Sequence, residues 1–137
     1  MRFSAAEAVR AAGIDEDRLM AAIAPVEPSR VPVWRAGRMM RTLWPRGITA
    51  MALPWGIYLA PAVLERPLAD LGPLIVHELT HIAQWRRLGP VGWARSYLGD
   101  YLRSRRGGMQ HHDAYRAIGL EVEARAAAEA LRPGGPR

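Results

Sequence analysis

Cysteine and lysine are both absent from this chain of 137 residues. Without cysteine, the chain cannot form a disulfide framework, a cysteine-ligated zinc finger, an iron–sulfur centre or a cysteine nucleophile. Any metal bound here would therefore have nitrogen and oxygen ligands. The basic residues are all arginine, nineteen of them, and the formal net charge is +6. Because basic stretches are more often solvated faces than nucleic-acid sites, we expect no specific nucleic-acid partner.

Long hydrophobic runs are also missing. The longest stretch without a charged side chain, residues 47–64, contains Pro54 and Pro61 and lacks sustained apolar character. It therefore favours buried strands and a turn, and we expect no stable membrane insertion. At the N-terminus, Arg2 and Glu7 interrupt any apolar segment, so the sequence predicts no signal peptide and a cytoplasmic location.

The length and the composition bound the architecture. A chain of this size has room for one compact domain with its own core. Half of its residues are apolar and 23% are charged, which excludes a disordered chain. Ser4 and Glu7 form a capping-box pattern that predicts a helix ending near Gly13, and a second helix is expected from Asp15 to Ala24. The predicted organisation is an N-terminal helical appendage at residues 1–30, a main domain at 31–132 and a disordered tail at 133–137.

The remaining elements are read from hydrophobic patterns and from glycine and proline positions. Short strands are expected at Arg38–Leu43, Ile48–Ala52 and Ile57–Leu59. The frequency of proline around them predicts edge positions rather than a central strand. Helices are expected from Pro73 to Gly89-Pro90, from Val91 to Arg105 and from Leu120 to Leu131. The predicted fold class is therefore α+β and mainly helical, with a small edge-type sheet.

Residues 77–81 read His-Glu-Leu-Thr-His, and this motif carries the chemistry of the sequence. On a helix, positions i and i+4 lie on one face, so His77 and His81 can bind one metal ion. Glu78 lies beside the first ligand and can reach a metal-bound water as a general base. In a chain with four histidines and eight glutamates, the chance of one such motif is below roughly 1%.

A catalytic zinc site usually has three protein ligands, so the two histidines need a partner further along the chain. The segment Glu121-Val122-Glu123-Ala124 is the best candidate, since a carboxylate there gives a site with two histidines and one glutamate. Glu121 and Glu123 flank the apolar stripe of their helix almost symmetrically, so periodicity does not choose between them.

Other side chains compete for the remaining roles. His111 and His112 are candidates for a third ligand or for a donor to the developing oxyanion, as well as for an ordinary solvated pair. Tyr97, Tyr101 and Tyr115 are the other candidate donors, although each also suits a packing role. Among them, we take His112 and Tyr115 as candidate catalytic residues.

The string HELTHIAQW at residues 77–85 resembles the gluzincin-type zinc metallopeptidases, and most closely a family of small zincin-like domains from bacteria. The hallmark of that family is an HELxHxxQ helix, preceded by a strand similar to Ile57-Tyr58-Leu59-Ala60-Pro61 and followed by an acidic ExEA segment. All three pieces occur here in that order, so the resemblance extends over about residues 47–130.

The resemblance implies a zincin-like domain in which the HExxH helix and a later glutamate-bearing helix hold Zn²⁺. His77 and His81 would be ligands and Glu78 the base. Glu121, the first glutamate of the ExEA segment, would be the third ligand. Related gluzincins often carry an acidic residue four positions later, where this chain has Arg125. Such families also occur near bacterial toxin or injection systems, which leaves a non-classical secretion route open.

The expected function is zinc-dependent hydrolysis of peptide bonds in a peptide or protein substrate. Zinc would polarise the scissile carbonyl and lower the pKa of its bound water toward about 7, and Glu78 would take the proton and pass it to the leaving amine. Either Ile48–Ala52 or Ile57–Leu59 could hold the substrate as an added strand. The alternative is a catalytically inactive zinc-binding module of zincin-like fold, whose arginine-rich segment 86–116 contacts a partner protein.

Overall fold

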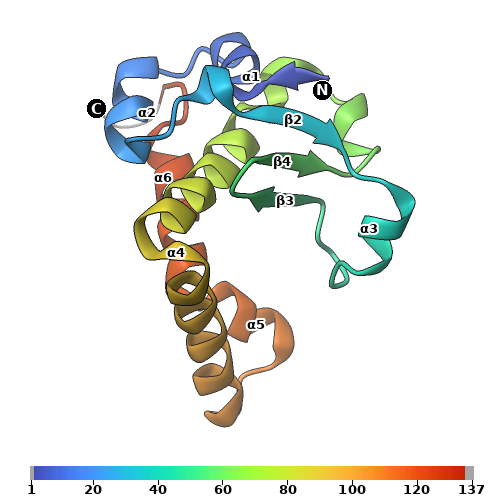
Figure 1. Cartoon of the computed structure of the whole chain (residues 1–137), viewed down its shortest axis with the longest axis vertical. Coiled ribbons are helices and arrows are strands. Elements are labelled where there is room, and N and C mark those ends of the chain that lie inside the picture. Colours follow the sequence, from blue (N-terminus) through green and yellow to red (C-terminus); the bar gives the residue numbers. More distant parts are fainter. Residues whose placement is uncertain (1, 135–137) are drawn as a thin grey trace.

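The computed structural model describes residues 2–134 and contains one mixed four-stranded sheet among several helices (Figure 1). The strands are β1 (Phe3–Ser4), β2 (Pro32–Arg35), β3 (Ala50–Leu53) and β4 (Gly56–Leu59). The helices are α1 (Ala5–Ala11), α2 (Glu16–Ile23), α3 (Arg38–Thr42), α4 (Gly72–Arg106), α5 (His111–Arg116) and α6 (Gly119–Ala130). Single turns of 3₁₀ helix lie at Pro28–Arg30, Val63–Glu65 and Leu68–Leu71. The predicted α+β, mainly helical class is confirmed.

The two predicted N-terminal helices are present and begin at the expected residues. The backbone N–H and the hydroxyl of Ser4 both donate to the Glu7 carboxylate, at 2.6 and 2.9 Å. Asp15 accepts from the backbone N–H of Arg18 at 3.0 Å and so begins α2. The core shows no break at residue 30, because buried side chains of both helices join the cluster around α4: Ala5, Ala8, Val9, Leu19 and Ile23.

The sheet has the strand order β1-β2-β4-β3. β2 pairs antiparallel with β1 and parallel with β4, and β3 forms an antiparallel hairpin with β4. The predicted edge position is therefore wrong for residues 57–59, since β4 has a neighbour on each side. The physical reason is that Pro54 and Pro61 flank β4 instead of interrupting it, which leaves every N–H of the strand free to pair.

The predicted strand at residues 38–43 is wrong, because this segment forms the short helix α3. Its large apolar side chains stay in solvent: Met39 is 83% exposed and Leu43 is 82% exposed. The strand prediction requires that one face of residues 38–43 packs against the core, and α3 has no buried residue. The predicted strand at residues 48–52 is present but begins later, at Ala50. The strands β1 and β2 and the helix α5 were not predicted as elements.

The long helix α4 bends at Gly89, which has a φ of 70° and a ψ of 170°. This left-handed conformation suits glycine, and Pro90 follows it, so α4 consists of two helical segments, residues 72–88 and 90–106. The predicted pair of helices with a break at Gly89-Pro90 is thus confirmed. At the other end, a Cβ on Gly72 would lie 2.3 Å from the Cβ of Ala12, so glycine allows α4 to begin against the end of α1.

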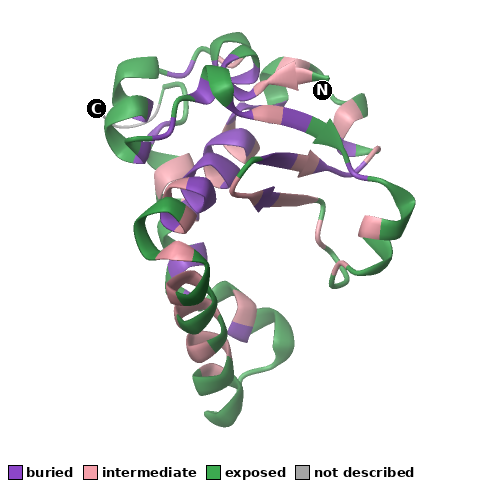
Figure 2. Cartoon of the chain, viewed as in Figure 1, coloured by how far each residue is buried: buried purple, intermediate pink, exposed green. Residues whose placement is uncertain are grey.

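The core lies between the sheet and the first segment of α4 and includes the buried side chains of α1 and α2 (Figures 1 and 2). Figure 2 shows buried residues concentrated there, whereas the second segment of α4 has only exposed and half-buried residues and α5 has one buried residue, Ala114. Among residues 2–134, no helix combines the length and the apolar character that a membrane crossing requires. Most of the predicted tail, residues 135–137, lies outside the described part of the chain.

Candidate metal centre

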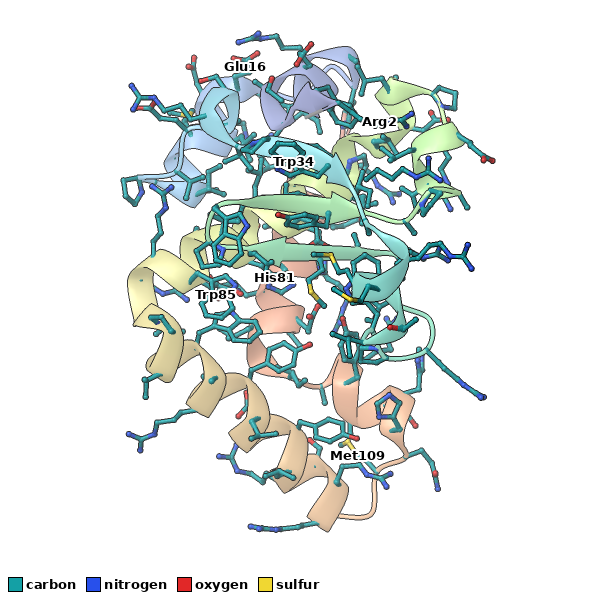
Figure 3. All side chains as sticks on the ribbon, turned by 45° about the vertical axis from the view of Figure 1, so that its right-hand side comes forward. Arg2, Glu16, Trp34, His81, Trp85 and Met109 are labelled. Carbon is teal, nitrogen blue, oxygen red and sulfur yellow. The ribbon has the colours of Figure 1, made fainter. Side chains whose placement is uncertain are left out.

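His77 and His81 lie one turn apart on the first segment of α4, as the motif predicts. Their rings meet edge to face with centroids 4.8 Å apart, and their Nε2 atoms are 3.1 Å apart. The helix is held in place by neighbouring apolar residues of the motif, since Leu79 and Ile82 are fully buried in the core. Figure 3 shows His81 on the stretch of α4 below the sheet, where Trp85 donates to the carbonyl of Ala52 in β3.

Glu121 approaches both histidines from α6. Its Oε2 lies 3.0 Å from His77 Nε2, and its Oε1 lies 3.2 Å from His81 Nε2. Among residues 2–134, His77, His81 and Glu121 form a group of three side chains that could bind one metal ion together. Their potential ligand atoms all lie within 4.8 Å of one another. Ligand atoms around one tetrahedral zinc ion stand roughly 3.3 Å apart, given zinc–nitrogen bonds of about 2.0–2.1 Å. The spacing of the three side chains therefore fits a single Zn²⁺.

The charges of this cluster also favour a cation. Burial alone would raise the pKa of Glu121, but hydrogen bonds from His77 and His81 and their positive charge hold that pKa well below its ordinary value. Burial alone would lower the pKa of His81, yet the Glu121 carboxylate raises it overall. Glu121 is thus ionised, and a positive charge between it and the two imidazoles is stabilised. A proton can supply that charge, and so can a divalent metal ion.

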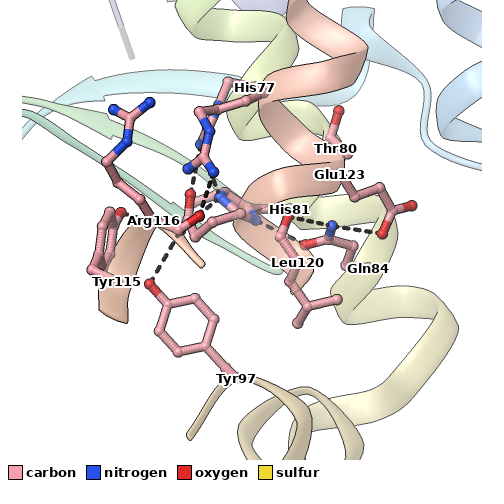
Figure 4. A network of polar contacts seen from close by, with 12 residues as sticks. His77, Thr80, His81, Gln84, Tyr97, Tyr115, Arg116, Leu120 and Glu123 are labelled. Carbon is pink, nitrogen blue, oxygen red and sulfur yellow. Dashed lines mark hydrogen bonds and ion pairs between the residues drawn. The ribbon is translucent and has the colours of Figure 1, made fainter. Parts of the chain in front are cut away.

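Gln84 fixes the orientation of His81 (Figure 4). Its Oε1 accepts from His81 Nδ1 at 2.8 Å, so the proton of a neutral imidazole sits on Nδ1 and the lone pair of Nε2 faces the cluster. The amide nitrogen of Gln84 donates to the carbonyl of Leu120 at 2.9 Å and to Glu123 at 3.0 Å. Gln84 therefore connects one histidine to the helix that carries Glu121. The sequence alone presents this glutamine only as part of the HELxHxxQ motif and does not reveal its partners.

Glu123 does not reach the histidine pair. Arg87 donates to its two carboxylate oxygens at 3.2 and 3.1 Å, and this interaction lowers the pKa of Glu123. Between the two alternatives that periodicity left open, the structure brings Glu121 to the cluster and places Glu123 beside Gln84, at the more exposed side of α6.

Two tyrosines complete the surroundings of Glu121. The hydroxyls of Tyr97 and Tyr115 each donate to Glu121 Oε1 at 3.1 Å, and Figure 4 shows both rings reaching toward the histidines. Burial, and then the Glu121 charge, raises the pKa of both hydroxyls, so they stay protonated donors. The sequence makes both tyrosines candidate donors, with Tyr115 as the candidate catalytic residue, and the structure places both hydroxyls at the same distance from Glu121 Oε1.

The remaining candidates lie further away. His111 pairs with the hydroxyl of Tyr101 at 2.8 Å, and His112 is exposed beside it. Neither histidine belongs to the converging group, so the structure does not bring them together with His77 and His81. Both nevertheless line the cleft described next, together with Tyr101.

A stack of aromatic rings was missed by sequence analysis. Trp93 stacks between Trp85 and Tyr97, with centroid separations of 4.3 and 4.6 Å. These residues belong to both segments of α4, so the stack holds the bend at Gly89 and brings Tyr97 to Glu121. The sequence does indicate the contact between Trp93 and Tyr97, because residues four apart on a helix are neighbours. It does not indicate the contact between Trp93 and Trp85, because the helix bends at Gly89 between them.

A cleft of about 680 Å³ opens over the cluster. Its walls are β3, the loop before β3, and parts of α4, α5 and α6, and both Glu78 and Glu121 face it. A second hollow of about 440 Å³ adjoins this cleft and is also lined by His77 and Glu78. Burial raises the pKa of Glu78, against the opposing effect of the positive charges on His81 and His77. A carboxylate with a raised pKa in a cleft is suited to accept a proton near neutral pH.

No family model, curated protein or solved structure was found to match this chain. The fold and the site themselves define an α+β domain with a candidate metal centre made of two histidines from one helix and one glutamate from another.

Substituting Gln84 is expected to weaken zinc binding. Gln84→Met removes the acceptor for His81 Nδ1, and the loss of such an outer partner typically lowers metal affinity about 10–100-fold. Gln84→Glu keeps an acceptor at that position and should retain more of the affinity. Thr80→Val is the matched control, because the Thr80 hydroxyl is buried in the same helical turn but donates only to the carbonyl of Val76. Competition with a chromogenic zinc chelator measures the affinities, and equal values for Gln84→Met and Thr80→Val would contradict this role.

Proposed function

We propose that this protein is a zinc-dependent peptide hydrolase. The observation that carries the proposal is the convergence of His77, His81 and Glu121 at the wall of an open cleft, with a buried glutamate, Glu78, directly beside the first histidine. A purely structural cation site would need neither the cleft nor the adjacent base. The gluzincin-type, zincin-like family stays part of this proposal and rests on the HELxHxxQ and ExEA motifs.

In the proposed reaction, His77, His81 and Glu121 hold the metal. When bound, Zn²⁺ supplies Lewis acidity, which polarises a carbonyl and acidifies a water molecule. Glu78 faces the cleft without belonging to the ligand group, so its carboxylate is free to take a proton from the attacking water. The same carboxyl then returns the proton to the leaving amine nitrogen, which completes cleavage of the peptide bond.

Tyr115 and His112 are the proposed donors to the oxyanion. The hydroxyl of Tyr115 lies at the cluster, where a small turn from Glu121 would direct it at a substrate oxygen. Tyr97 offers the same chemistry from the opposite helix. His112 lines the cleft, and its side chain has no hydrogen-bond partner among the described residues. It would therefore donate only to a substrate group that extends toward α5.

The sheet supports one of the two proposed substrate-binding strands. β4 is paired on both sides, but β3 is an edge strand with no strand among the described residues on its other side, where the Ala52 carbonyl accepts from Trp85 and the Ala52 N–H donates to the Glu78 carboxylate. Ala50, Met51 and Ala52 of β3 line the cleft. An extended peptide that adds to β3 would obtain backbone hydrogen bonds while it crosses the cluster.

The second candidate function is zinc binding without catalysis, as part of a protein–protein interaction module. The exposed second segment of α4 favours it, because Val91 is 72% exposed and Leu98 is 55% exposed on a helix that also carries several arginines. In this interpretation, the metal would hold α6 against α4 and leave the second segment of α4 for a partner.

A hydrolysis assay separates the two functions. The zinc-loaded protein should cleave a denatured protein mixture, a chelator should stop the reaction, and added zinc should restore it. Cleavage is followed by the release of new amino termini. A protein that contains one zinc ion per chain but releases no new termini would support the interaction module instead of the hydrolase.

A further inference from the structure

Three arginines line the cleft without an acidic partner. Arg46 comes from the loop before β3, Arg116 from the end of α5 and Arg125 from α6. Among the described residues, none of the three forms an ion pair, whereas five arginines elsewhere in the chain do: Arg10, Arg30, Arg87, Arg103 and Arg132. Other described arginines outside the cleft are also without an ion pair, but these three lie together in the cleft that opens over the metal centre.

The acidic groups of this cleft do not balance them. The carboxylates among its lining residues are Glu78 and Glu121, and both belong to the proposed catalytic centre. A divalent cation at the centre would offset the charge of these two glutamates, so the three guanidinium groups would keep the cleft positive. A cleft of one sign concentrates ligands of the opposite sign.

Arg125 has the most favourable position of the three. It follows Glu121 by four residues on α6, so it lies one helical turn away on the same face. It borders both the main cleft and the second hollow, which meet at His77. Its guanidinium donates to the backbone carbonyl of Arg116, which leaves further N–H groups available. A guanidinium held in this way can bind a carboxylate through two parallel hydrogen bonds.

We propose that the cleft selects peptides with a carboxylate close to the bond that lies over the metal centre, and that Arg125 is the residue that recognises this carboxylate. This inference rests on the proposed function, which it extends by a substrate class. The carboxylate has two sources, an aspartate or glutamate side chain and the free C-terminus of the peptide. The strand-free edge of β3 favours a peptide over a nucleic acid, because a strand edge offers backbone groups that pair with peptide groups.

The test measures binding separately from hydrolysis. Short peptides of serine and alanine, labelled at the N-terminus with a methoxycoumarin that has no carboxylate, carry either a central pair of glutamates or a central pair of glutamines, each with a free or an amidated C-terminus. They are titrated by fluorescence anisotropy against the full, zinc-loaded chain that carries Glu78→Gln, which prevents cleavage. We expect the glutamate peptide, or the peptide with a free C-terminus, to bind about tenfold more tightly than its neutral counterpart. A gain in affinity of this size corresponds to one hydrogen-bonded pair between a guanidinium and a carboxylate. The arm that shows the difference identifies the source of the carboxylate.

Variants then assign the preference to Arg125. Arg125→Gln should abolish the difference between the peptides, and Arg125→Lys should retain part of it because the charge remains. Arg95→Gln is the matched control, since Arg95 is exposed on the second segment of α4 and does not line the cleft. Thermal melting of each variant shows that the fold is intact.

The outcomes are distinct. Equal affinities for charged and neutral peptides, a preference that survives in Arg125→Gln, or stronger binding of a single-stranded oligonucleotide than of the glutamate peptide would each overturn the inference. If the carboxylate preference is found but the wild-type chain cleaves none of the peptides, the proposed hydrolase function fails and the carboxylate site stands. If the wild-type chain cleaves charged and neutral peptides alike, the hydrolase function stands and the inference fails.

Discussion

Glu78→Gln is expected to abolish peptide hydrolysis while zinc binding stays unchanged. Glutamine keeps the size of the side chain, but it cannot accept the proton of the attacking water at neutral pH. Loss of a general base typically lowers the rate about 10²–10⁴-fold. Glu78 does not belong to the converging ligand group, so the metal content should remain at that of the wild-type chain. The release of amino termini and elemental analysis measure the two properties on one preparation.

Glu65→Gln is the matched control for this substitution. Glu65 is exposed in a 3₁₀ turn and lies outside both hollows, so its replacement changes the net charge equally without touching the cleft. Hydrolysis at the wild-type rate by Glu78→Gln would exclude Glu78 as the base. Loss of zinc together with activity would show instead that Glu78 is a ligand.

The part of the site that sequence predicts is its local part. His77, Glu78 and His81 are related by helical geometry alone, and a helix with a clear beginning at Pro73 and a glycine end guarantees their arrangement. The same holds for α1 and α2, whose capping residues Ser4 and Asp15 act within one turn. In each case the pattern and the contact lie within a few residues.

The part that sequence leaves open depends on contacts between distant segments. Glu121 and Glu123 have equivalent places beside the stripe of α6, and only the packing of α6 on α4 turns one toward the histidines. Gln84 acts through Leu120, 36 residues later. The central position of β4 likewise follows from its parallel pairing with β2, which a local pattern of prolines cannot reveal. Tertiary packing decides these features, and hydrophobic periodicity does not encode it.

Glu121→Gln is expected to remove stoichiometric zinc, and Glu123→Gln is expected to keep it. Both substitutions replace a carboxylate with an amide of the same size on the same helix, so each is the control for the other. Glu121→Gln should lower the zinc affinity by more than about a hundredfold. Replacing a residue that only hydrogen-bonds to a metal ligand already lowers metal affinity about 10–100-fold, and Glu121 is itself a proposed ligand. Glutamine at position 121 can still accept from Tyr97 and Tyr115, so these half-buried hydroxyls keep a partner and the fold should survive.

Zinc titration with elemental analysis of the dialysed protein measures both variants, and His81→Ala provides the reference for a lost ligand. If Glu121→Gln retains one zinc ion per chain while His81→Ala loses it, the metal is bound without the α6 carboxylate. If only Glu123→Gln loses zinc, the ion pair with Arg87 must open for Glu123 to become the third ligand. The expected order, with zinc lost from the Glu121 and His81 variants alone, would establish that helices α4 and α6 hold the ion between them.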